Sequence, residues 1–268
     1  MDHDTASVLA DFTTSTFEHE GETRTIYSLG EGPAVIVIHE IPGITPLVAE
    51  FGRKVAAAGM TAVLPDLFGT PGRPPSGSYL ASSMASACIS REFTVLAMHR
   101  TSPVIGWLRA LSREWHDRCG GPGVGAVGMC LTGGFALAMM VDPVVVAPVL
   151  SQPSLPFPLG AARKRSLGVS DSDLAVIKER VASGTPVIGL RFTCDRAVPA
   201  ERFARLREEL GDGFVGVEID SSETNPWGYP KAAHSVLTEA YSDVEGSPTR
   251  LALEQVLAFF AERLGLTP

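Results

Sequence analysis

The chain has 268 residues, 45% of them hydrophobic, which is enough to bury a sizeable core. Its net charge of −8 and the lack of any Lys- or Arg-rich run exclude the basic patch typical of nucleic-acid binders. Residues 1–22 contain no Lys or Arg, so we expect no secretory signal. The longest apolar stretch, residues 133–150, is interrupted by Asp142, Pro143 and Pro148, which favours a helix, a turn and a strand over a membrane span.

Four cysteines are present, with neither a CxxC pair nor a zinc-ligand spacing: Cys88, Cys119, Cys130 and Cys194. We therefore expect free thiols in a cytoplasmic protein, with no metal and no cofactor. No coiled-coil pattern indicates an assembly, and we expect a monomer or a small homo-oligomer that contacts neither nucleic acid nor membrane.

Short β-branched runs alternate with stretches of helical spacing along most of the chain. Strands are predicted over residues 23–29 (an edge strand), 34–38, 61–64, 124–129, 144–150, 186–192 and 213–219. Helices are predicted over residues 47–58, 93–113, 135–140, 171–182, 199–210 and 251–264. This alternation predicts an α/β fold with a mostly parallel central sheet and helices on both faces. Residues 1–22 are expected to be a loose N-terminal segment, and residues 23–268 a single domain.

Polar side chains follow four of these strands, at the edge where ligands of such sheets bind. Glu40 follows the second predicted strand, Cys130 follows the strand over residues 124–129, Asp195 follows the strand over 186–192, and His234 comes after the last strand. The order nucleophile, acid, histidine is that of α/β-hydrolase triads. A neighbouring imidazole can take the proton of a thiol, and a carboxylate can fix the imidazole tautomer.

The turn at Cys130 also predicts an oxyanion site. A strand that turns sharply into a helix directs the first amide N–H groups of the helix toward the exposed sulfur. The amide of Leu131 is one expected donor, and the amide of Ile41, on the loop after residues 34–38, is the second. Structural interpretations stay open: Cys130 as a small core residue, Asp195 as a helix cap, and His234 as a hydrogen-bonded core histidine.

The sequence resembles the dienelactone hydrolase family of the α/β-hydrolase superfamily. The resemblance rests on Ile38-His39-Glu40-Ile41-Pro42-Gly43, Ala62-Val63-Leu64-Pro65-Asp66-Leu67, Gly128-Met129-Cys130-Leu131-Thr132-Gly133-Gly134, Asp195-Arg196-Ala197-Val198-Pro199 and Ala233-His234-Ser235. It implies an α/β-hydrolase fold with Cys130 as nucleophile, His234 as base and Asp195 as its orienting acid. It also implies that Glu40 contacts the resting thiol and is redirected when substrate binds, so that the thiolate forms.

Two positions depart from the family pattern. Thr132 stands where glycine is usual, which would crowd the turn. Thr238 stands where dienelactone hydrolase has an arginine that binds the substrate carboxylate, and Arg91 lies in the region of the second arginine. Arg91 either binds an anion or is a surface charge.

Loops over residues 69–90 and 151–168 are expected to wall the substrate pocket, with Tyr79, Leu80, Leu155 and Phe157 as contacts. The same sequence pattern is also typical of flexible hydrophobic loops that cover an edge of the core. The first functional hypothesis is a cofactor-independent hydrolase of a small ester or lactone that forms a thioester at Cys130. The alternatives are a thiol redox or peroxide-sensing protein that pairs Cys130 with Cys194, and a non-catalytic scaffold that binds a small ligand.

Overall fold

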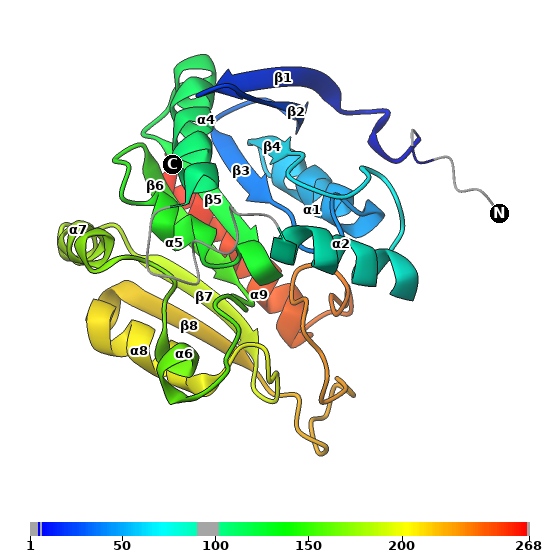
Figure 1. Cartoon of the computed structure of the whole chain (residues 1–268), viewed down its shortest axis with the longest axis vertical. Helices are drawn as coiled ribbons and strands as arrows, with labels where there is room; N and C mark the ends of the chain where they lie inside the picture. Colours follow the sequence, from blue (N-terminus) through cyan, green and yellow to red (C-terminus); the bar gives the residue numbers. More distant parts are fainter. Residues whose placement is uncertain (1–4, 6, 90–101, 267–268) are drawn as a thin grey trace.

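The described residues form one eight-stranded sheet (Figure 1). The computed structural model describes residues 5, 7–89 and 102–266, and of residues 84–89 only the backbone. The strands are β1 Thr13–His19, β2 Glu22–Leu29, β3 Ala34–Ile38, β4 Thr61–Pro65, β5 Val124–Met129, β6 Val145–Ser151, β7 Val187–Phe192 and β8 Phe214–Ile219. The described α-helices are α1 Pro46–Ala57, α2 Gly77–Ile89, α4 Pro103–Cys119, α5 Phe135–Met139, α6 Ala161–Arg165, α7 Asp171–Ala182, α8 Ala200–Leu210 and α9 Pro248–Arg263.

The strand order across the sheet is β1-β2-β4-β3-β5-β6-β7-β8. Strand β2 is antiparallel to both of its neighbours, and every other neighbouring pair is parallel. The mostly parallel sheet with helices on both faces is thereby confirmed. The carboxyl ends of β3, β5, β6, β7 and β8 consequently meet at one edge, where ligands of such folds bind.

Central strands are buried on both faces, which explains their continuous apolar sequence. All five residues of β3 are buried, and they alternate between two core clusters. Ile36 and Ile38 pack on the side covered by α4, α5, α7 and α8, whereas Val35 and Val37 pack on the side covered by α1 and α9. Helices on both faces therefore hold the ends of β3 and β5 rigidly in place.

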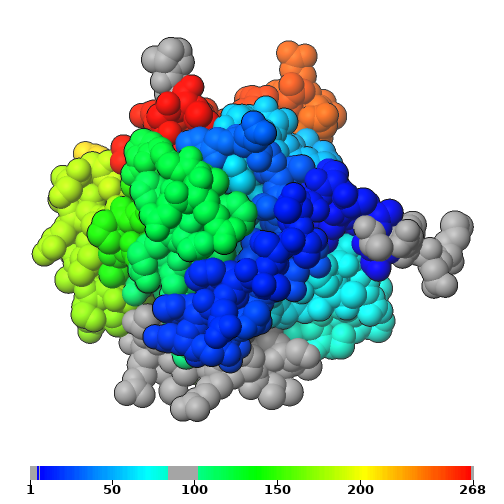
Figure 2. All heavy atoms as spheres, turned by 90° about the horizontal axis from the view of Figure 1, so that it is seen from above, coloured from blue at the N-terminus to red at the C-terminus, as the bar shows by residue number. Residues whose placement is uncertain are grey.

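The N-terminal segment differs from the expectation. Residues 13–19, expected to be loose, form β1, which pairs along its whole length with β2. The rings of Phe17 and Trp107 lie 5.3 Å apart, and Trp107 Nε1 donates to the Glu22 carbonyl at 3.0 Å. Figure 2 shows the N-terminal strands lying beside the surface of α4. Strand β2 begins at Glu22 and is second in the sheet rather than at its edge, because β1 covers it.

Three helices also differ from the expectation. Helix α4 extends to Cys119, six residues beyond the predicted end, and stops at Gly120, whose φ is 70°; the predicted start at residue 93 lies outside the described residues. Helices α2 and α6 lie within segments expected to be irregular loops. None of the described helices is long and apolar enough to span a membrane.

Candidate active site

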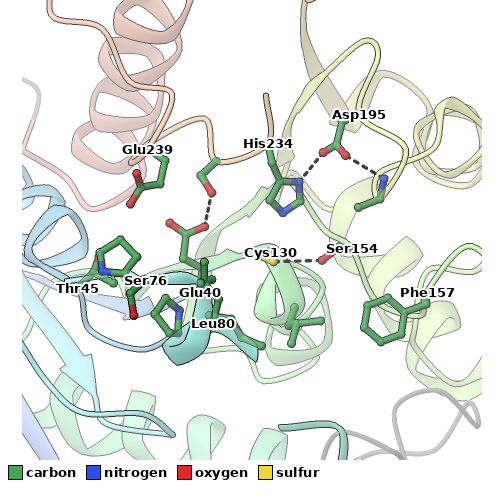
Figure 3. A pocket seen from close by; sticks show the side chains of 17 residues that line it. Glu40, Thr45, Ser76, Leu80, Cys130, Ser154, Phe157, Asp195, His234 and Glu239 are labelled. Carbon is green, nitrogen blue, oxygen red and sulfur yellow. Dashed lines mark hydrogen bonds and ion pairs between the residues drawn. The ribbon is translucent and has the colours of Figure 1, made fainter. Parts of the chain in front are cut away.

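Residues from the carboxyl ends of four strands line one cavity with a volume of about 660 Å³ (Figure 3). Glu40 follows β3, Cys130 follows β5, Asp195 follows β7, and His234 follows β8 after a loop. Ile41 and Leu131, whose amides were the expected oxyanion donors, line the same cavity. The structure thus brings together six residues from four separate parts of the sequence.

Cys130 occupies a sharp turn between β5 and a short 3₁₀-helix over Cys130–Thr132. Its φ of 56° lies in the left-handed region, which a non-glycine residue adopts at a cost of about 1–3 kcal/mol. Glycines on both sides make the turn possible. A Cβ on Gly128 would lie 2.0 Å from the Thr132 carbonyl oxygen, and one on Gly133 would lie 2.5 Å from Pro153 Cα. This is the strand–turn–helix geometry that exposes a nucleophile.

Thr132 stabilises this turn rather than crowding it. Its fully buried hydroxyl accepts a hydrogen bond from the Met129 amide at 2.9 Å. The same hydroxyl lies 2.9 Å from the Ile38 carbonyl oxygen at the end of β3, to which it can donate. The hydroxyl therefore links the turn that carries Cys130 to the end of β3, just before Glu40 and Ile41. The crowding expected from a side chain at this position does not occur, because the side chain points into this hydrogen-bonding site.

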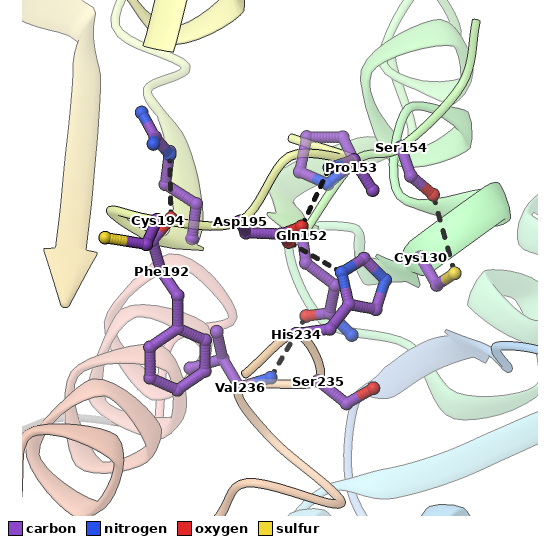
Figure 4. Close-up of polar contacts among 12 residues, drawn as sticks. Cys130, Gln152, Pro153, Ser154, Phe192, Cys194, Asp195, His234, Ser235 and Val236 are labelled. Carbon is purple, nitrogen blue, oxygen red and sulfur yellow. Dashed lines mark hydrogen bonds and ion pairs between the residues drawn. The ribbon is translucent and has the colours of Figure 1, made fainter. Parts of the chain in front are cut away.

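Cys130, His234 and Asp195 lie close together, with the imidazole of His234 between the sulfur and the carboxylate (Figure 4). His234 Nδ1 lies 2.6 Å from Asp195 Oδ2, and the other carboxylate oxygen of Asp195 accepts from the Ala197 amide at 2.9 Å. Burial lowers the pKa of His234, but hydrogen bonds with Asp195 and with the Cys130 sulfur outweigh burial and raise that pKa to about 10. This pKa favours an imidazolium at neutral pH, which is hydrogen-bonded to the Asp195 carboxylate and interacts electrostatically with the Cys130 sulfur.

A hydrogen bond reaches the sulfur from the loop after β6. Ser154 Oγ donates to Cys130 Sγ at 3.4 Å, and the Ser154 amide donates to the Cys130 carbonyl at 3.0 Å. The sequence analysis did not single out Ser154, although it lies in one of the two loops expected to wall the pocket. Its place beside Cys130 follows from the position of β6 next to β5 in the sheet.

Glu40 is buried, with 4% of its surface exposed, and accepts hydrogen bonds from three side chains. Ser235 Oγ donates at 2.6 Å, Gln152 Nε2 donates at 3.1 Å, and the Thr238 hydroxyl also donates. Gln152 in turn accepts from the Val236 amide at 3.3 Å. The resemblance implied a contact between Glu40 and the thiol, whereas in this structure the carboxylate is bonded to the segment that follows His234.

The remaining predicted residues have different outcomes. Phe157 and Leu80 line the cavity, as expected from the two loops. Tyr79 does not: its ring is buried, and its hydroxyl accepts from the Thr70 amide and donates to the Thr70 carbonyl, which turns it toward its own loop. Arg91 lies outside the described residues. Within the described ranges, no group of three or more His, Cys, Asp or Glu side chains is arranged to hold a metal ion.

Two buried basic residues form hydrogen bonds with backbone groups in the segments that border the site. Burial lowers the pKa of His39 to about 4, so the ring is neutral; Nδ1 can donate to the Glu40 carbonyl at 3.1 Å while Nε2 accepts from the Leu67 amide at 3.1 Å. The hydrogen bond with Leu67 connects the end of β3 to the end of β4.

Arg202, with 1% of its surface exposed, donates to carbonyl oxygens along the loop that carries Ser154 and Phe157. The bond between His39 and Leu67 and the bonds from Arg202 to this loop join residues far apart in the sequence, so no local sequence pattern indicates them.

Solved structures share this fold at low sequence identity. The dienelactone hydrolase from Anabaena variabilis is 16% identical, with a TM-score of 0.59 over 94% of this chain and 98% of that one. The dienelactone hydrolase-like promiscuous phosphotriesterase P91, from metagenomic libraries, is 17% identical, with a TM-score of 0.61 over 95% of this chain and 98% of that one. At these identities the likeness shows the fold.

The sequence itself also has relatives. A curated relative, the fragment YghX of Escherichia coli (strain K12), is 40% identical over 55 residues, which span 19% of this chain and 47% of that relative, about half its length. The model of the dienelactone hydrolase family matches residues 25–264, nearly the whole chain. The match confirms the resemblance, and the chain belongs to the dienelactone hydrolase family.

Proposed function

We propose that this protein hydrolyses a small ester or lactone through a cysteine nucleophile, with Cys130, His234 and Asp195 as the catalytic triad. Family membership supports a hydrolase. The observation that supports the finer assignment is that Cys130 and the hydrogen-bonded pair of His234 and Asp195 line one cavity, with the sulfur on a strained strand-to-helix turn. No cofactor is needed for the chemistry that follows.

In the first half of the reaction, Cys130 Sγ attacks the carbonyl carbon of the substrate as a thiolate. The amides of Leu131 and Ile41 donate to the oxyanion, and each such donor is typically worth about 3–4 kcal/mol in the transition state. His234 gives its proton to the departing alkoxide, and the acyl group remains on sulfur as a thioester. Asp195 holds the imidazole tautomer and stabilises the imidazolium.

In the second half, water attacks the thioester carbonyl and His234 accepts a proton from it. The carboxylic acid leaves, the sulfur is released as thiolate, and the imidazolium forms again beside it. For a lactone, the alcohol and acid products are one molecule. Both steps use the same oxyanion donors.

Glu40 belongs to this proposal as a residue that affects acylation. Its hydrogen bond to Ser235, the neighbour of His234, supports an influence on the base. Glu40→Gln should lower the acylation rate while the circular dichroism spectrum stays that of the native fold. Unchanged single-turnover acylation would remove Glu40 from the mechanism.

The redox alternative is less well supported by the geometry. Cys194, the expected resolving cysteine, lines a separate hollow, and its sulfur points away from Cys130 on the far side of Asp195 (Figure 4). The described cysteines Cys119, Cys130 and Cys194 are free, which supports the proposed cytoplasmic location.

The test is mass spectrometry of the intact protein after rapid mixing with a panel of activated esters. We expect an acyl adduct on Cys130 that decays at the rate of turnover. Cys130→Ala should abolish both adduct and hydrolysis, whereas the matched variant Cys194→Ala should keep both. Full hydrolysis by Cys130→Ala would refute the proposal, and binding without turnover by the native protein would favour the ligand-binding scaffold.

A further inference from the structure

The cavity around Cys130 carries an excess of negative charge. Its described lining contains three carboxylates, Glu40, Asp195 and Glu239, and neither Lys nor Arg. Asp195 is paired with the imidazolium of His234 at 2.6 Å, so these two charges largely cancel. Two carboxylates, those of Glu40 and Glu239, remain without a cation among the described lining residues.

Glu40 and Glu239 differ in how they are held. Glu40 is buried and its oxygens accept three hydrogen bonds, so it is a fixed part of the cavity floor. Glu239 is exposed and forms no ion pair with any residue that the structure describes. Figure 3 shows both carboxylates on one side of Cys130, with Asp195 and Phe157 on the other. Although the residue as a whole is exposed, partial desolvation of its carboxyl group, followed by the charge of Glu40, raises the pKa of Glu239.

Two described basic side chains lie in a hollow that adjoins the cavity rather than in its lining. Arg196 and Lys231 line a neighbouring hollow with Cys194, behind Asp195. Lys231 is moreover paired with Glu223, whose carboxylate lies 2.6 Å from its Nζ. At longer range the net charge of −8 favours the approach of cations over anions.

We propose that the cavity selects esters or lactones that carry a cationic group, and that Glu239 is the side chain that determines this preference. The inference rests on the hydrolytic function proposed above and names its substrate class. Glu239 can approach an ammonium group without first breaking a bond to the protein. The apolar walls formed by Ile41, Leu80 and Leu131 accommodate the hydrocarbon that joins this group to the reacting carbonyl.

The expected preference is moderate, because Glu239 faces solvent. We take two opposite charges about 6 Å apart and an effective dielectric constant between that of a protein surface and that of water. Their attraction is then enough to change a rate constant about 3–10-fold. Since salt screens exposed charges, the preference should shrink as the ionic strength rises. An anionic substrate should be disfavoured by a similar factor.

The test compares 4-nitrophenyl esters that share a leaving group and a chain length but end in a trimethylammonium, a tert-butyl or a carboxylate group. A second series carries the same three groups on the alcohol of an acetate ester, so that either orientation in the cavity is probed. The quantity measured is kcat/KM for the cationic ester divided by kcat/KM for its neutral isostere. We expect a ratio of about 3–10 in at least one series.

Three variants decide the role of Glu239. Glu239→Gln should bring the ratio to near one, and Glu239→Lys should reverse the preference toward the carboxylate ester. Glu245→Gln makes the same charge change at an exposed position outside the cavity lining and should leave the ratio unchanged.

Two failures are distinguishable. Hydrolysis of the neutral esters with a ratio near one in both series, or a ratio that Glu239→Gln does not alter, overturns the inference and leaves the hydrolase proposal standing. A preference for the carboxylate ester in the native protein also overturns it. Hydrolysis that survives Cys130→Ala overturns the proposed function instead.

Discussion

Replacing Arg202 by methionine should destabilise the protein markedly. The guanidinium of Arg202 lies in the interior, with 1% of the residue exposed. It donates to the carbonyl oxygens of Pro153 and Pro156 at 2.5 Å, Ser166 at 2.9 Å and Arg163 at 3.2 Å. Arg202 thus donates to four carbonyl oxygens within residues 153–166. Methionine keeps an unbranched apolar stem but removes every donor.

The magnitude follows from two opposing contributions. Hydrogen bonds from a charged donor are worth about 1.5–3 kcal/mol each, so four of them give about 6 kcal/mol at the lower end. Burial lowers the pKa of Arg202 from 12.5 to about 10, which corresponds to a cost of about 3 kcal/mol for keeping the charge inside. The difference predicts that Arg202→Met lowers the free energy of unfolding by about 3 kcal/mol.

Urea unfolding followed by tryptophan fluorescence measures this loss. Arg205→Met is the matched control, because Arg205 lies on the same helix and forms a surface pair with Glu209 at 3.0 Å, for which we expect about 0.5 kcal/mol or less. Arg202→Lys should fall between the two, since one ammonium reaches fewer carbonyls. If Arg202→Met were no less stable than Arg205→Met, the assignment of these bonds as stabilising would be wrong.

Three further predictions concern the site and its surroundings. Thr132→Val should cost about 1–3 kcal/mol of unfolding free energy by leaving the Met129 amide without its acceptor, whereas Thr132→Ser should cost less; thermal unfolding distinguishes them. Asp195→Asn should lower the pKa of His234 from about 10, visible in an NMR pH titration, and slow hydrolysis about 10²-fold or more; an unmoved titration would contradict the pairing. Burial raises the pKa of Asp66 to about 6, so the native state binds its proton more tightly, and stability falls as pH rises from about 4 to 6. Asp66→Asn should therefore be about 2 kcal/mol more stable than the native protein at pH 7 and lose this advantage below about pH 4, as urea unfolding at both pH values would reveal.

The architecture was predictable because the central strands are buried on both faces. A run such as residues 34–38 leaves few alternatives to a parallel strand, and the polar residues that follow such strands mark the edge where a site forms. The predicted residues Glu40, Cys130, Asp195 and His234 do line one cavity. Strand β1 escaped prediction because its residues are partly or fully exposed, so its alternation carries little apolar signal.

The partners of these residues were not predictable, because they depend on contacts between distant parts of the chain. Glu40 meets Gln152 and Ser235, which are 112 and 195 positions away. A strand-end position fixes where a backbone lies, but not which neighbour a carboxylate turns to. The same limit explains Tyr79, which lies in α2 beside residues that line the cavity but whose hydroxyl turns back to Thr70.

The hydrogen bonds of the Thr132 hydroxyl bear on which residues around the site can be substituted during evolution. It joins the turn that carries Cys130 to the end of β3, next to Glu40 and Ile41. The spacing between the sulfur and the amide of Ile41 is therefore set within the sheet and its first turns. The residues of α2 and its preceding loop that face the cavity take no part in this linkage. They can accumulate substitutions that alter the accepted substrate while the reacting atoms keep their arrangement.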